Sequence, residues 1–266
     1  MSDDIFYANL SGTRLISDIR SIELPIYSLS TNAIEHKQRI IQLNRRKIIV
    51  SPNDYGRPTI CDKRFIWYVG GQILAAIDHG IPTSPHIMIH PCDFFKVINR
   101  GDGSKQYDAV LASIRRLRGT TIEVISDQNK YNSYRNFSLL SEAEVSYSKF
   151  KNQPISIKIR LADCIYNEII SGKVISFNEE YLSISSPLVA RLYEIFEKQA
   201  GVKDLWKIKL EILHKWSGSL SPQRTLKHQF KKGIIKVPGF SFKIDERRDP
   251  SIIGKRTGSP RKRKTW

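Results

Sequence analysis

The fold is decided by residues 104–119, which read SKQYDAVLASIRRLRG. Ser104 is a favourable N-cap, and Gly119 favours the end of a helix. Between them, apolar residues recur at helical spacing on one face: Tyr107, Val110, Leu111, Ile114 and Leu117. The stretch therefore predicts a helix that packs by one side only, with its opposite side exposed.

Two further helices are predicted upstream of this one. Asp62 can cap a helix over residues 63–79, where apolar residues keep helical spacing until a glycine follows. Residues 87–89 predict a short strand, and a proline opens a second helix over residues 91–100. Three helices with a tight turn between the last two predict a helix-turn-helix.

Strands are predicted directly after the helix-turn-helix. Residues 120–125, 134–147 and 155–161 contain segments in which apolar and polar side chains alternate, the period of a half-buried strand. A strand hairpin that follows a helix-turn-helix is the wing of a winged-helix domain, so we expect one here.

The second half of the chain repeats this order. Its predicted elements are a helix over 187–199, a strand over 205–209, a helix over 210–216, a helix that starts at Pro222, and a hairpin over 237–244. We therefore expect an α+β chain with two tandem winged-helix domains.

Domain limits follow from these patterns. Residues 1–23 show no sustained period and predict an N-terminal arm, residues 24–168 the first winged-helix domain, and residues 169–245 the second. Residues 246–266 hold eight Lys and Arg residues against two acids and few apolar residues, which predicts a disordered basic tail.

The charge of the chain indicates a polyanionic partner. Its 266 residues carry 43 Lys and Arg against 26 Asp and Glu, a formal net charge of +17. A phosphate backbone would relieve the resulting repulsion and release condensed counterions, so we expect nucleic acid. No run approaches the roughly 18 apolar residues of a membrane-spanning helix, and the N-terminus lacks a signal-peptide pattern, so we expect no membrane partner and a cytoplasmic protein.

No enzymatic chemistry is expected. The phosphate-binding pattern GxxxxGK[ST] and the zinc pattern HExxH are absent, and the three cysteines form no CxxC pair. His86 and His90 flank a predicted strand, but no third ligand is evident. We therefore expect no catalytic residue, no metal and no cofactor.

The exposed side of the predicted helix 104–119 mixes cations with small side chains. A recognition helix needs this mixture, because small residues let the backbone approach base edges while Arg or Lys donates to guanine. An ordinary solvated helix face is the alternative. Arg115 and Arg118 lie nearer the flanks and suit phosphates, as do Lys149 and Lys151 at the wing tip. The residues expected to face bases are Lys105, Ala109, Ala112, Ser113 and Arg116.

The second predicted recognition helix is more basic than the first. Residues 221–236 contain no acid, and Lys232 suits a backbone phosphate. Two such helices would address successive major grooves, roughly 34 to 36 Å apart, without a dimer. The role of one histidine in the set stays open, because a histidine on a basic face can be a bystander. The residues that turn away from the apolar side are Arg224, Lys227, His228 and Lys231.

Short motifs in both halves resemble one protein family, the replication initiator protein A family of plasmids. The similarity extends from about Leu24 to Ile244. Each motif is short, but their order and spacing together are specific. The motifs are Asp62-Lys63, Asn99-Arg100-Gly101, Arg116-Leu117-Arg118-Gly119-Thr120, Tyr166-Asn167, Arg191-Leu192-Tyr193-Glu194 and His214-Lys215-Trp216-Ser217-Gly218-Ser219.

The resemblance implies a function. Such proteins are tandem winged-helix initiators that bind repeated sequences, called iterons, at a plasmid origin, promote its opening and help the host initiator and helicase load. They commonly dimerise through the first module and can repress their own genes. The alternatives are a transcription repressor without a replication role and a nicking or rolling-circle enzyme. The residues leave open the target bases, the active oligomer, the identity of the host partners and the role of the N-terminal arm.

Overall fold

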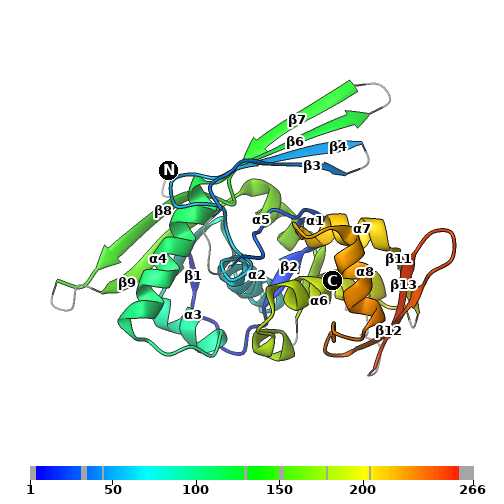
Figure 1. Ribbon diagram of the computed structural model, residues 1–266. Coiled ribbons are helices and arrows are strands. Elements are labelled where there is room, and N and C mark those ends of the chain that lie inside the picture. The colour runs from blue at the N-terminus through cyan, green and yellow to red at the C-terminus, as the bar shows by residue number, and fades with distance from the viewer. Residues whose placement is uncertain are drawn as a thin grey trace. The chain divides into compact units, whose positions relative to one another are not determined.

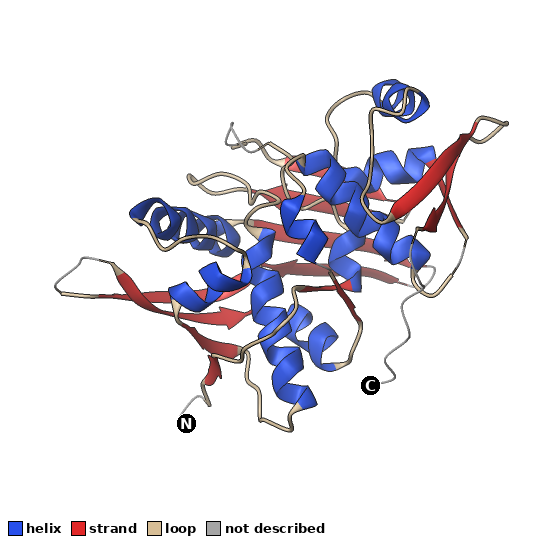
Figure 2. Cartoon of the chain, turned by 90° about the horizontal axis from the view of Figure 1, so that it is seen from below, coloured by secondary structure: helices blue, strands red, loops and turns tan. Residues whose placement is uncertain are grey.

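The chain folds into two compact units (Figure 1). Unit 1 comprises Met1–Asp18 and Ile26–Asn178, and unit 2 comprises Ile19–Pro25 and Glu179–Trp266. The colours of Figure 2 show the mixture of helices and strands that makes this an α+β fold. The computed structural model describes residues 4–30, 35–43, 45–128, 131–149, 153–177, 179–203 and 205–257.

Unit 1 is built around its longest helices and two four-stranded sheets. Its helices are α2 (Lys63–Asp78), α3 (Pro91–Val97), α4 (Ser104–Gly119) and α5 (Asp163–Ile170). Its strands are β1 (Phe6–Ala8), β2 (Ile16–Asp18), β3 (Arg39–Leu43), β4 (Arg46–Ser51), β5 (His86–Ile89), β6 (Thr121–Gln128), β7 (Tyr131–Phe137), β8 (Leu140–Tyr147), β9 (Pro154–Leu161) and β10 (Val174–Ser176).

The two sheets of unit 1 have different strand orders. One runs β1-β5-β9-β8, so that β9, the last of these four strands in the sequence, lies between β5 and β8, and only the β1–β5 pair is parallel. The other is the antiparallel sheet β3-β4-β6-β7, and the short strands β2 and β10 form a separate pair. The β6–β7 hairpin therefore leaves α4 and joins a different sheet before the chain returns in β8.

Aromatic side chains join α2, α3 and α4 of unit 1 into one core. Phe94 of α3 packs edge-to-face against Phe65 and Tyr68 of α2, with ring centroids 5.4 and 5.5 Å apart. Phe95 packs in the same way on Tyr107 of α4 at 5.1 Å. The amphipathic period of α4 thus buries its apolar side in the core of unit 1, with Tyr107 against α3, as its sequence predicts.

Unit 2 repeats part of this plan on a smaller scale. Its sheet has the order β11-β13-β12, so that the last strand again lies in the middle, with both of its neighbours antiparallel. Its elements are α1 (Ile19–Glu23), the 3-10 helix η1 (Glu179–Ser183), α6 (Pro187–Ala200), β11 (Trp206–Lys209), α7 (Leu210–Ser217), α8 (Gln223–Lys231), β12 (Phe240–Asp245) and β13 (Ser251–Arg256).

Phe196 is the centre of the unit 2 core. Its ring lies 4.5 Å from that of Trp206, 5.4 Å from that of Phe242 and 5.7 Å from that of Phe240. Gly254 of β13 lies directly beneath Trp206, and a Cβ at this position would lie 2.3 Å from the indole ring. Glycine is therefore required in the middle strand for the sheet to pack on this core.

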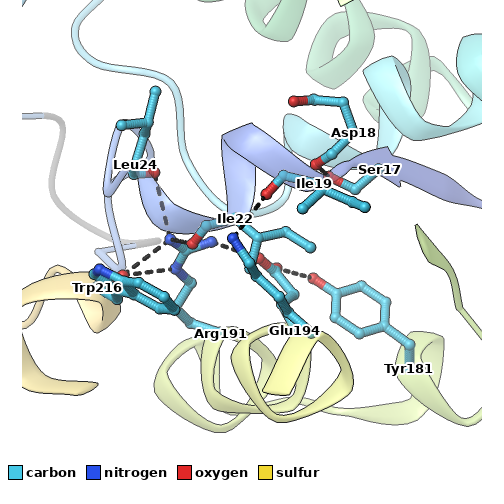
Figure 3. A network of polar contacts seen from close by, with 10 residues as sticks. Ser17, Asp18, Ile19, Ile22, Leu24, Tyr181, Arg191, Glu194 and Trp216 are labelled. Atoms are coloured by element: carbon cyan, nitrogen blue, oxygen red, sulfur yellow. Dashed lines mark hydrogen bonds and ion pairs between the residues drawn. The ribbon is translucent and has the colours of Figure 1, made fainter. Parts of the chain in front are cut away.

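A buried arginine fastens α1 to the rest of unit 2 (Figure 3). The Nη2 atom of Arg191 donates to the carbonyl oxygen of Ile22 at 2.7 Å, and its Nε and Nη2 donate to that of Trp216 at 3.1 and 2.9 Å. Its Nη1 pairs with Glu194 at 2.6 Å, and Glu194 also accepts a hydrogen bond from Tyr181. These contacts account for the polar groups that α1 buries against α6.

The structure confirms the helices predicted from the sequence, but the predicted arm, domain boundary and tail all differ from what is observed. The predicted arm over 1–23 is wrong, because β1 and β2 pair with β5 and β10 of unit 1 while α1 belongs to unit 2. The boundary between the units lies after Asn178 rather than after residue 168. The predicted tail over 246–266 is wrong for 251–256, which form β13, and the part over 258–266 lies outside the described residues.

Candidate nucleic-acid interface

The exposed side of α4 is narrower than its sequence predicts. Lys105 and Ala109 are exposed, whereas Ala112, Ser113 and Arg116 are half-buried. The free part of the predicted stripe is therefore its N-terminal half, which is the part of a recognition helix that contacts base edges.

The assignment of Arg116 to base contact is wrong, because its guanidinium is bound within unit 1. Its Nε donates to Oδ2 of Asp62 at 2.8 Å and its Nη2 to Oδ1 at 2.7 Å. These hydrogen bonds raise the pKa of Arg116 above its ordinary value. Ser113, one turn earlier, also donates to Asp62 and so leaves the base-facing set as well. The expected N-cap role of Asp62 is wrong too, since its side chain makes no capping bond.

The two flanking arginines of α4 are both exposed. The guanidinium of Arg115 lies over the ring of Tyr55, 5.1 Å from its centroid. Arg118 lines a shallow hollow together with Glu142 and Glu144 of β8. These two acids reduce the positive potential around Arg118, so of the two flanking residues Arg115 suits a phosphate better.

A short polar turn positions α8. Gly218 ends α7 in the left-handed conformation, with φ of 72°. Serines occupy every second position from 217 to 221. The Ser219 amide donates to the Ser217 hydroxyl, and the Ser221 amide donates to the Ser219 hydroxyl. His214 of α7 contacts the Ser221 carbonyl oxygen at 2.7 Å through Nε2. These hydrogen bonds stabilise the turn between α7 and α8.

Cations cover the outer side of α8. Arg224, His228 and Lys231 are exposed and Lys227 is half-buried, while Leu226 and Phe230 turn into the core. Lys232 follows the last turn and is exposed.

An acid near α8 is absent from the local sequence but present in the structure. One carboxylate oxygen of Glu246, in the loop after β12, lies 2.5 Å from Nζ of Lys231 and 3.7 Å from Nζ of Lys227. The inference that the cations of α8 have no counterion is therefore wrong for these two lysines. Arg224 has no ion-pair partner within the described ranges and remains the strongest candidate on this helix for contact with DNA.

The hairpin of unit 2 is formed by β12 and β13, not by residues 237–244 as predicted. Its loop reads Glu246-Arg247-Arg248-Asp249-Pro250, and both arginines are exposed. Asp245 accepts hydrogen bonds from Nε and Nη2 of Arg247 at 2.9 and 3.0 Å, and from Lys207 at 3.1 Å. These bonds hold the pKa of Asp245 well below its ordinary value. Arg247 and Arg248 are candidate phosphate contacts that the predicted tail concealed.

The hairpin of unit 1 is formed by β8 and β9, where the sequence predicts it. Lys149 at its tip is exposed, whereas Lys151 lies outside the described residues. In Figure 1 this hairpin extends away from the end of α4.

The described residues hold neither a metal site nor a membrane-spanning helix. No group of three or more His, Cys, Asp and Glu side chains is placed to hold a metal ion in the described parts of the chain. None of the helices described is both long enough and apolar enough to cross a membrane.

Comparison of the sequence with known proteins identifies a family and one relative. The family model described as Replication initiator protein A matches residues 17–241. A putative replication protein of Wigglesworthia glossinidia brevipalpis is 26% identical over 246 residues, which cover 90% of this chain and 88% of that protein.

Two solved structures of RctB domains have a fold similar to that of this chain. A crystal structure of domains 2 and 3 of RctB superposes with a TM-score of 0.66 at 11% identity, covering 91% of this chain and 99% of that one. A second structure of RctB domains 2–3 gives 0.57 at 12% identity, covering 87% and 95%. Because the family model covers most of the sequence, the chain belongs to the replication initiator protein A family.

Proposed function

We propose that this chain initiates plasmid DNA replication by binding repeated origin sequences through two winged-helix modules. The observation that carries the proposal is the recurrence of one plan in both units. Each has a helix, a strand, a helix-turn-helix and a hairpin, with the last strand in the middle of the sheet. This order of elements is the one expected of a winged helix, in which the second helix of the helix-turn-helix enters the major groove.

In this proposal α4 and α8 are the recognition helices. Lys105, Ala109 and Ala112 of α4 face bases. Arg224, Lys227, His228 and Lys231 of α8 do the same in the second module. Arg115, Arg118, Lys149, Lys232 and the loop arginines of unit 2 contact phosphates. Because phosphate contacts carry no sequence information, specificity would lie with the first two groups.

The wider role follows from the family rather than from the site. We propose that the protein acts in the cytoplasm on plasmid DNA, has no catalytic activity of its own, and recruits the host initiator and helicase to opened DNA. Dimerisation through unit 1 and repression of its own gene belong to the same proposal. Binding energy and the host machinery would then open the origin DNA, because the protein itself would have no ATPase to do so.

The test is a footprint on the DNA that flanks the gene. Directly repeated protected sites are expected for the wild-type protein. Lys105→Ala and Arg224→Ala should each lose about 1 to 3 kcal/mol of specific binding and relax the preference at one base pair, as loss of a base contact does. Lys173→Ala and Arg14→Ala are matched controls, because each removes an exposed cation that lies outside α4 and α8. Both should bind as the wild type does.

Three outcomes would contradict the proposal. If Lys105→Ala and Arg224→Ala both bound the site unchanged, the recognition-helix assignment would be wrong. Failure of the gene and its adjacent repeats to sustain a plasmid without another origin would indicate a repressor. A covalent adduct with supercoiled origin DNA in the presence of magnesium or manganese would indicate a nicking enzyme.

A further inference from the structure

A buried carboxylate joins the start of α2 to the last turns of α4. Asp62 is 2% exposed, and its carboxylate accepts two hydrogen bonds from Arg116 and one from Ser113. The amide of Thr59 donates to the same group at 2.7 Å. All the polar contacts of this carboxylate are thus directed at α4 and at the turn before α2, and none at the first turn of α2 itself.

The same loop holds α4 at a second place. The side-chain amide of Asn53 donates to the Arg115 carbonyl oxygen at 3.2 Å. A Cβ on Gly119 would lie 1.8 Å from the Asn53 nitrogen, so only glycine allows this approach. Residues 53–62 therefore contact the C-terminal part of α4 at Ser113, Arg115, Arg116 and Gly119.

This geometry controls the rotation of α4 about its own axis. The planar fork of Arg116 bonds both carboxylate oxygens, which fixes direction as well as distance. Lys105, Ala109 and Ala112 lie on the same side of the helix as Arg116, at spacings of three and four residues. Turning or tilting the helix at Arg116 would therefore move the base-facing residues together.

A contribution to stability alone is a weak explanation for such a pair. The desolvation of the buried Asp62 carboxylate and the half-buried Arg116 guanidinium offsets much of their attraction, and apolar replacements of similar volume for such pairs are often neutral or stabilising. What the charged pair adds is a defined geometry. This argues that its value lies in the orientation of α4.

We propose that Asp62 and Arg116 form a positioning pair for DNA recognition by α4. The pair touches no base in this arrangement, and it acts by setting where Lys105, Ala109 and Ala112 lie. The inference rests on the proposed function, because it assigns α4 to the major groove. It replaces a direct base contact by Arg116 with an indirect effect that Asp62 shares.

The experiment compares affinities over a panel of sites that each differ from the wild-type site by one base pair. The full-length variants are Asp62→Asn, Arg116→Lys, their double mutant and Lys105→Ala, with thermal unfolding measured for each. Arg116→Lys keeps the charge but loses the fork, so the salt dependence should stay unchanged. Ser113→Ala provides a milder change at the same carboxylate.

Asp62→Asn and Arg116→Lys are expected to weaken binding to the wild-type site by about tenfold each, as loss of a charged hydrogen bond does. Both should keep the wild-type order of preference across the panel, and the double mutant should be no weaker than the weaker single mutant. Lys105→Ala should instead lose preference at one base pair. If Asp62→Asn does not fold, the same pattern in Arg116→Lys and Ser113→Ala carries the test.

Other results would overturn the inference. Unchanged affinity of Asp62→Asn and Arg116→Lys would show that the pair does not position α4. Relaxed preference at a single base pair in Arg116→Lys, with Asp62→Asn unchanged, would make Arg116 a base-reading residue. If the wild-type protein showed no sequence preference, the proposed function would fail, and the positioning role with it.

Discussion

At the scale of single residues, Glu246 determines how much of the charge on α8 is available to a polyanion. It contacts Lys227 and Lys231, whose side chains are 34% and 44% exposed, and it is itself 44% exposed. Phosphate oxygens that approach these lysines must displace this carboxylate and are repelled by it. We therefore expect Glu246 to weaken non-specific DNA binding by unit 2.

Glu246→Gln is expected to raise affinity for DNA of any sequence by about two- to fivefold, the range of an exposed ion pair. The dependence of affinity on salt should also become steeper, because two more lysines can release counterions. Fluorescence anisotropy at two salt concentrations measures both effects. Glu211→Gln is the control, since Glu211 pairs with Lys215 on α7 rather than with α8. Unchanged affinity of Glu246→Gln would rule out this screening.

Prediction from the sequence failed for residues whose side chains are paired with a partner far away in the sequence. A helical wheel places Arg116 on the outer side of α4 correctly, but it cannot show that Asp62 covers this position. Glu246 lies outside the acid-free window of residues 221–236 and returns to it only because β12 folds back. Lys105 of unit 1 and Arg224 of unit 2 are exposed as predicted, since no described residue of either unit covers them.

At the scale of elements, β13 is the part that the sequence conceals. Its six residues lie in a window dominated by cations, so composition predicts a tail. In the structure β13 pairs with both β11 and β12, and Ile252 is fully buried. The long helices were predictable because a 16-residue amphipathic period is a strong signal, whereas strands of three to six residues depend on partners far along the chain.

Truncation after Asp245 is therefore expected to unfold unit 2 rather than to remove only non-specific affinity. The middle strand would be lost and the Trp206 and Phe242 side of the core exposed. Circular dichroism and thermal unfolding should show the loss of a cooperative transition, while truncation after Thr257 should keep it. Equal unfolding curves for the two truncated proteins would contradict the role given to β13.

At the scale of the whole molecule, the chain passes between the units more than once. It leaves unit 1 after Asp18, returns after Pro25, and leaves again after Asn178. No single cut separates the units, and a domain boundary read along the sequence cannot describe this. The spacing of apolar residues predicts which side chains are buried, but it does not predict the unit in which they are buried.

Arg191→Met tests how firmly α1 is held. The substitution leaves Glu194 buried without its charged partner, which costs about 3 to 5 kcal/mol in the free energy of unfolding. Amide exchange and proteolysis should increase over residues 19–25. Arg160→Met removes an exposed pair with Asp163 at the same spacing and should change stability by no more than about 1 kcal/mol. Unchanged protection of residues 19–25 in Arg191→Met would contradict the role of Arg191.

The threading of α1 has a consequence for biosynthesis. During translation, residues 19–25 are made long before Arg191 and Trp216, which complete their contacts. Unit 2 can close only after β13 has also been made, so α1 is synthesised without its final partners. Assembly of the second module is thereby tied to the synthesis of its last strand.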